Sequence, residues 1–170
     1  RFLPYAYMRR AASYFNMKQY DRTANDYAAI LQKFPQHPVA QQVLLPLQEA
    51  LGLAGRSGEF ENYLALYKKA NPESKNLEVV EFEAAKTLYF DQQYARAITA
   101  FNGFLINYPQ SSRIQEAHYY LAESHYRQRE LEKALSIYTA LSSDPTFSML
   151  NRVVARMAEI EFRLGRYEKA

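Results

Sequence analysis

Aromatic and charged side chains recur on one face of several predicted helices, where they could bind a ligand. Each of these faces is marked by a small Ala, and it continues three residues before that Ala and four residues after it. An aromatic ring therefore follows the Ala by one turn in four places, and a polar residue follows it directly in most of them. The residues that we predict to bind a partner on these faces are Phe82, Lys86, Tyr89, Tyr119, Glu123, Tyr126, Arg127, Glu159 and Arg163.

The rings on these faces have two interpretations. They could form a ladder that binds an extended peptide or a glycan, or they could fill the gap between adjacent helical hairpins. Packing is the favoured interpretation for Phe15 and Phe162. For the tyrosines both interpretations stay open, because a buried hydroxyl needs water or a hydrogen-bond partner.

The charged residues also allow two interpretations. Glu123 with Arg127, and Glu159 with Arg163, are spaced i, i+4 with the acid first. Such a pair stabilises a helix by roughly 0.2–0.5 kcal/mol. The same side chains could instead form a charged groove that selects a ligand, but we rank the intrahelical pairs first.

Metal and catalytic chemistry find little support in the sequence. His118 and His125 lie seven residues apart and His37 lies between two prolines, whereas a zinc site usually needs three or four ligands. There is no Gly-x-Ser-x-Gly elbow and no Gly-rich phosphate loop. We therefore predict no enzyme activity, no cofactor and no metal.

Composition narrows the class of partner. The chain has 170 residues, 48% hydrophobic and 23% charged, with a net charge of +3. Its charges are interleaved rather than gathered in a basic stripe, so we expect no nucleic-acid binding. No apolar run reaches the roughly 18 residues of a membrane span. The absence of Cys excludes disulfides and fits either a reducing or an oxidising compartment.

Internal repetition determines the predicted fold. The segments YDRTANDYAAILQKFP from Tyr20 and YARAITAFNGFLINYP from Tyr94 align without a gap at an offset of 74, twice a unit of about 37 residues. Such a period predicts an all-α solenoid of antiparallel helical hairpins. The helices are expected near 4–17, 20–34, 38–55, 59–70, 76–91, 94–108, 112–128, 131–143 and 147–164, with a tenth beginning at 167.

The repeats predict one solenoid domain with five units. Their approximate ranges are 1–36, 37–74, 75–110, 111–146 and an incomplete 147–170. The second unit is irregular: its aromatic landmark moves 40 residues from Tyr20 to Phe60 and then 34 to Tyr94, and Pro46 is expected to kink its first helix. This unit is a candidate hinge, with ordinary repeat drift as the alternative. Ser112 and Gln115 predict a capping box at the start of one helix.

The landmarks resemble the tetratricopeptide repeat. The small residue of the first helix is Ala11, Ala85, Ala122 and Ala158, the aromatic opening the second helix is Tyr20, Phe60, Tyr94 and Tyr167, and the closing prolines are Pro35, Pro72, Pro109 and Pro145. The resemblance implies a right-handed superhelical solenoid and a non-catalytic scaffold, whose first helices line a concave groove for a protein or peptide. The alternatives are an accessory domain of a larger cell-wall enzyme, or a structural spacer.

The run from Tyr108 to Tyr138 is similar to envelope proteins of this family, such as the Tol-Pal coordinators, the lipoprotein of the outer-membrane assembly machine and large Bacteroidetes repeat proteins. That similarity implies a periplasmic or outer-membrane-associated scaffold in a Gram-negative bacterium, with a cytoplasmic location as the alternative. Because the chain stops where a new half-repeat begins, we expect a fragment of a longer protein whose exposed ends could self-associate.

Overall fold

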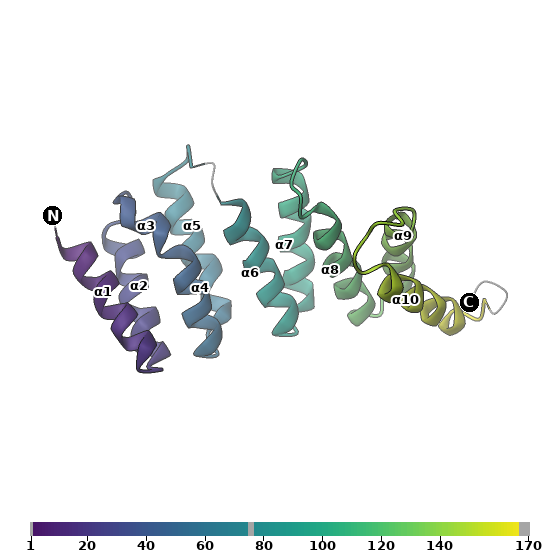
Figure 1. The fold of residues 1–170 in the computed structure, drawn as a ribbon, viewed down its shortest axis with the longest axis horizontal. Helices are drawn as coiled ribbons and strands as arrows, with labels where there is room; N and C mark the ends of the chain where they lie inside the picture. Colours follow the sequence, from purple (N-terminus) through teal and green to yellow (C-terminus); the bar gives the residue numbers. More distant parts are fainter. Residues whose placement is uncertain (1, 75–76, 167–170) are drawn as a thin grey trace. The chain divides into compact units, whose positions relative to one another are not determined.

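The computed structural model describes residues 2–74 and 77–166, and over these residues the fold is all-α, without a strand (Figure 1). The predicted tenth helix, from 167 onward, lies outside the described residues. The elements are α1 (Leu3–Asn16), α2 (Tyr20–Lys33), α3 (Pro38–Gln42), α4 (Leu44–Leu53), the short 3-10 helix η1 (Ser57–Glu59), α5 (Phe60–Ala70), α6 (Glu78–Phe90), α7 (Tyr94–Asn107), α8 (Ile114–Arg127), α9 (Leu131–Ser142) and α10 (Leu150–Arg163). Among the described residues, every helix is too short or too polar to cross a bilayer.

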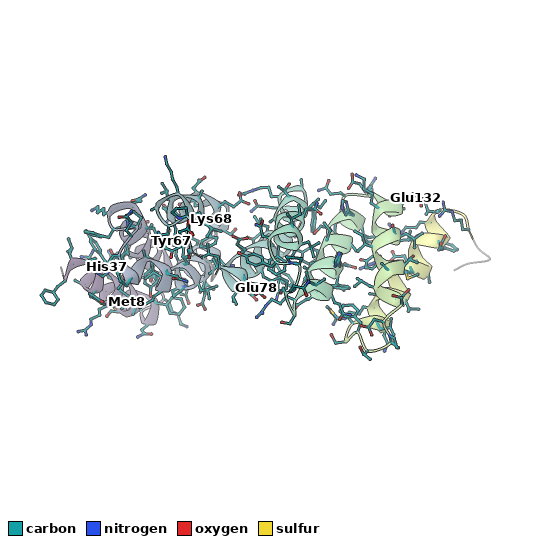
Figure 2. The ribbon with its side chains drawn as sticks, turned by 90° about the horizontal axis from the view of Figure 1, so that it is seen from above. Met8, His37, Tyr67, Lys68, Glu78 and Glu132 are labelled. Atoms are coloured by element: carbon teal, nitrogen blue, oxygen red, sulfur yellow. The ribbon has the colours of Figure 1, made fainter. Side chains whose placement is uncertain are left out.

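The chain divides into two compact units, residues 1–87 and residues 88–170. In the first unit α1 and α2 form an antiparallel hairpin, and α2 also packs on α4 and α5 (Figure 1). Its core is mostly aliphatic and includes Ile30, Leu47 and Leu51, which are fully buried, together with the buried rings of Phe60 and Tyr67. Lys68 on α5, labelled in Figure 2, reaches α6 through an ion pair of 2.5 Å with Glu81.

The second unit is also built of neighbouring hairpins. α8 packs on α7 on one side and on α9 on the other, and α9 packs on α10. Tyr138, Val153 and Ile160 are fully buried in the core of this unit. Phe101 on α7 is fully buried as well, and its ring stacks on Tyr120 of α8. Large aromatic side chains thus fill the space between these hairpins.

A left-handed residue follows the first helix of every hairpin. Positive φ angles occur at Lys18, Gly55, Gln92, Arg129 and Gly165, so the intervals are 37, 37, 37 and 36 residues. At each position the amide of the left-handed residue and the amide of the next residue donate back to helix carbonyls, as where Gln92 N bonds Tyr89 O at 3.0 Å and Gln93 N bonds Leu88 O at 2.9 Å. This is the Schellman ending of a helix. This helix ending marks the repeat at a regular spacing of 36 or 37 residues, whereas the spacing of the aromatic landmarks is irregular.

The irregular second repeat is explained by a local insertion. Tyr20 comes two positions after Lys18 and Tyr94 two positions after Gln92, but Phe60 comes five positions after Gly55. The three additional residues are η1, and α5 is three residues shorter than α2, with 11 residues against 14. The helix ends therefore return to the 37-residue spacing by the end of α5. The Arg56 side chain fixes the insertion by bonding both Glu59 oxygens at 2.8 Å and Asp21 at 3.2 Å.

The helix predicted over residues 38–55 is interrupted, but not as expected at Pro46. The break falls at Val43, between α3 and α4, and Pro46 lies in the first turn of α4. Proline has no amide hydrogen, so it cannot bond the carbonyl four residues earlier, and it is tolerated in a first helical turn. The chain therefore ends one helix and starts another upstream of Pro46.

The predicted capping box at Ser112 and Gln115 is wrong. α8 begins at Ile114, and the amide of its neighbour Arg113 bonds the hydroxyl of Ser111 at 3.0 Å. The Gln115 side-chain amide donates instead to Asp144 Oδ2 at 2.5 Å, which joins α8 to the segment after α9. A contact with the end of the same α8–α9 hairpin has replaced a local cap.

Replacing Gln92 by Gly should raise the free energy of unfolding by about 1 kcal/mol. Gln92 has a φ of 61°, a conformation that is strained for a residue with a Cβ and natural for Gly. Denaturation in urea, followed by circular dichroism, would measure the gain. The matched control is Gln93→Gly at a φ of −86°, which should give no gain. Equal stabilisation by both changes would contradict the prediction.

Candidate functional site

An open depression of about 370 Å³ lies between α8 and α10 in the second unit. We call it the α8–α10 pocket. The repeat places it there, because α8 and α10 are the first helices of successive hairpins and α9 joins them. Its lining consists of Tyr119 and Glu123 from α8 and Arg152, Ala155, Arg156 and Glu159 from α10.

The floor of the α8–α10 pocket is a buried carboxylate. The Glu123 residue is only 3% exposed, and three side chains from three other helices donate hydrogen bonds to it. They are the Tyr138 hydroxyl from α9, the Tyr89 hydroxyl at 3.3 Å from α6, and Arg156 of α10, whose Nε and Nη2 lie at 3.0 and 3.2 Å. A buried carboxylate is stable only when it is paired and hydrogen-bonded in this way.

Glu159 on α10, the second acid of the pocket, accepts hydrogen bonds from three side chains as Glu123 does on α8. Glu159 accepts from the Tyr126 hydroxyl at 2.5 Å, from Arg156 at 2.6 Å and from Arg163 at 2.6 Å. The Arg156 guanidinium also lies 4.1 Å from the centre of the Tyr126 ring, a cation–π contact. Tyr89 and Tyr126 thus each donate to the acid on the next first helix.

The pKa values in this network follow from burial and from these partners. Burial raises the pKa of Tyr138 far above its usual value, and the hydrogen bond to Glu123 adds to the effect. Burial and the Glu123 charge raise the pKa of Tyr89 to about 12. The hydrogen bond from Tyr126 lowers the pKa of Glu159. At neutral pH the hydroxyls are therefore protonated donors and Glu159 is an ionised acceptor.

The predicted ion pairs are half right. Glu159 and Arg163 form the expected i, i+4 pair at 2.6 Å. Glu123 does not pair with Arg127 but with Arg156 of the next hairpin at 3.0 Å. The exposed Arg127 lies against the Tyr89 hydroxyl instead. Sequence spacing within one helix could not reveal a partner 33 residues away.

The predicted partner-binding residues differ widely in exposure. Phe82 is 1% exposed, and Tyr119 and Tyr126 are 7% and 8% exposed, so these three rings offer little surface to a partner. The two predicted arginines, Arg127 and Arg163, are exposed, and Tyr89, Lys86 and Glu159 are half-buried. The structure brings Tyr89, Tyr119, Glu123, Tyr126, Arg127, Glu159 and Arg163 together in the second unit. Lys86 lies 3.7 Å from Glu83 in the first unit, where its ammonium is 5.3 Å from the Phe82 ring centre.

Phe15 and Phe162 are the two aromatic rings that were expected to pack between hairpins. Phe15 packs edge-on against Tyr20 with ring centres 5.5 Å apart, and Tyr89 meets Tyr94 in the same way at 5.8 Å. Phe162 is 63% exposed among the described residues, and the aromatic that would match Tyr20 and Tyr94 is Tyr167, outside the described residues. The rings of Phe15 and Tyr89 therefore stabilise the turn inside their own hairpin.

Three residues of this site were missed by the sequence reasoning. Arg156 and Arg152 were not selected, and Tyr138 was named only as the end of the run that is similar to envelope proteins. One signal was available: Tyr89 precedes Glu123 by 34 residues and Tyr126 precedes Glu159 by 33, nearly one repeat in each case. A hydroxyl and an acid recurring at the repeat length indicate contacts between successive hairpins.

The histidines lie in separate local contacts. His118 Nδ1 is 2.9 Å from the Ile114 carbonyl oxygen, and His125 Nδ1 is 2.5 Å from Glu130 Oε2. His37 caps α3 through the Val39 amide at 3.3 Å. Within residues 2–74 and 77–166, potential metal ligands form no group of three or more.

Comparison with known families places two segments of the chain. Two models described as tetratricopeptide repeat match residues 5–37 and residues 82–146, and together they span more than half of the sequence. No curated protein matches the chain. The matched segments include most of α1 with α2, and most of α6 with α7 to α9, and α1 packs on α2 and α8 on α9 as helical hairpins. Residues 5–37 and 82–146 of this chain therefore belong to the tetratricopeptide-repeat family.

Proposed function

We propose that this protein is a non-catalytic scaffold that binds a protein partner at the α8–α10 pocket. Tetratricopeptide repeats generally serve protein–protein interaction rather than catalysis, which supports this class of function. The observation that carries the proposal is the open depression between two first helices, with Arg152 and Ala155 exposed at its edge.

The predicted site residues divide into two roles in this proposal. In this proposal the partner contacts the exposed side chains of Arg127, Arg152 and Arg163 and the exposed part of Glu159. The buried residues Tyr119, Glu123 and Tyr126 do not contact the partner. Their packing and hydrogen bonds hold the two first helices at a fixed distance. Tyr89 holds Glu123 from α6. Lys86 offers a half-buried cation in the first unit, and Phe82 supports it.

A cross-linking experiment tests the location of the partner. The chain has no Cys, so Ala155→Cys creates a unique attachment point for a benzophenone maleimide inside the α8–α10 pocket. Asn102→Cys, on the exposed side of α7, is the matched control. In an extract of the organism that makes the protein, light should join a protein to the label at position 155 and not at position 102.

The control determines how a negative result is interpreted. Cross-linking of the same protein with equal yield at both positions would mean that the pocket is not the binding surface. No cross-linked protein at position 155, although the labelled variant is folded, would also contradict the proposal.

A Gram-negative envelope setting is the second part of the proposal. It is supported only by the similarity of residues 108–138 to envelope members of the family. Fractionation of cells that express the tagged full-length gene product would test it. Recovery with the periplasm or outer membrane is the expected result, and recovery in the cytoplasm would contradict it.

A further inference from the structure

We infer that the partner segment held at the α8–α10 pocket is acidic, and that Arg152 binds one of its carboxylates. This inference rests on the proposed function and adds the chemistry of the partner to it. It comes from comparing the charged side chains that are paired with one another inside the protein with those that are exposed to solvent.

The acids of the pocket are already occupied. Glu123 and Glu159 each accept hydrogen bonds from three side chains, and Arg156 is shared between the two. Glu123 is also 3% exposed, so a cationic group of a partner could not reach it without displacing Arg156. The pocket therefore has little capacity left to bind a positively charged segment.

The cations of the pocket are less fully occupied. Arg152 is exposed, and its side-chain contact among the described residues is with the hydroxyl of Tyr119. The pocket lining holds two arginines and two acids, and one of the arginines, Arg156, is paired with both acids, so Arg152 is the cation of the lining that neither of these acids neutralises. The remaining charge is positive, and it is located where α8 and α10 face the solvent.

The geometry at Arg152 suits a carboxylate. A guanidinium is planar, carries five N–H donors and can bind both oxygens of a carboxylate at once. Ala155, one turn further along α10, has only a methyl group and leaves room beside Arg152. Nucleic acid fits less well, because its phosphates need a long row of cations, and this chain interleaves its charges with a net value of only +3.

Binding of defined peptides to the intact chain tests the inference. The probes are fluorescein-labelled octapeptides of glutamate, glutamine and lysine, with labelled octathymidylate as the nucleic-acid probe, all measured by fluorescence anisotropy. The glutamate peptide should bind most tightly, and binding should weaken as salt rises from 50 to 300 mM. Arg152→Gln should weaken it about tenfold, Arg152→Lys should lose less, and Arg9→Gln, an exposed arginine of α1, should leave it unchanged.

The outcomes show separately whether the acidic segment and the proposed function hold. Equal binding of the glutamate and glutamine peptides, or full binding by Arg152→Gln, would overturn the acidic segment. Tighter binding of octathymidylate would overturn it in favour of nucleic acid. If the glutamate peptide fails to bind while the label at position 155 still captures a protein, the inference is wrong and the proposed function stands. If both experiments fail, both proposals are wrong.

Discussion

Replacing Glu123 by Ala should lower the free energy of unfolding by about 3–5 kcal/mol, the effect expected for removing one partner of a buried ion pair. The change would leave the hydroxyl of Tyr138, which is fully buried, without its acceptor. It would also leave the half-buried Arg156 without the acid that lies 3.0 Å away. Urea denaturation of the intact chain, followed by circular dichroism, would measure the loss.

The matched control for this change is Glu159→Ala. Glu159 also accepts from three donors, but its side chain is 36% exposed, so water can replace the lost acceptor. We expect a loss of about 1 kcal/mol or less. A loss at position 159 as large as that at position 123 would contradict the role of burial in this network.

Replacing Ala122 by Leu should destabilise the protein by about 1–3 kcal/mol. Ala122 is fully buried in the core of the second unit, at the position where the first helix meets its neighbours. A larger side chain must push α8 away from the packed rings of that core. Thermal and urea denaturation would both report the change.

The control for overpacking is Ala95→Leu on the exposed surface of α7. Because this position faces the solvent, its effect should stay within about 0.5 kcal/mol. If Ala122→Leu were equally harmless, the close approach of helices at the small residue would not be needed for the fold.

Much of the fold was predictable from the sequence because its causes are periodic. The fold class was correct, since the 37-residue repetition implies one hairpin after another and the structure is all-α over the described residues. The small residues Ala11, Ala85 and Ala122 are fully buried, as close helix packing requires. The division into five repeats within one domain remains a prediction.

The errors came from choices between a local partner and a distant one. Gln115 bonds Asp144 rather than forming a cap, and Glu123 bonds Arg156 rather than Arg127. In both cases the local pattern was satisfactory by itself, but folding brought a competing group within hydrogen-bond distance. The left-handed residues were missed for a different reason: Lys18, Gln92 and Arg129 occupy a backbone conformation that sequence reasoning assigns to Gly.

The candidate site was only partly visible for the same reason. The sequence showed that tyrosines and acids share the faces of first helices. It did not show that tyrosine hydroxyls on one first helix donate hydrogen bonds to the carboxylates on the next. That pairing changes the proposed chemistry, because it leaves arginines rather than tyrosines or acids as the groups available to a partner.

The central claim is that acids on the first helices, above all the buried Glu123, join successive hairpins, and a double-mutant cycle between Glu123 and Arg156 tests it most directly. The changes are Glu123→Gln and Arg156→Gln, singly and together, with the free energy of unfolding measured in urea. We predict a coupling energy of about 1–3 kcal/mol, because the two groups lie 3.0 Å apart in a buried site. Single effects that add to within about 0.5 kcal/mol would contradict the account.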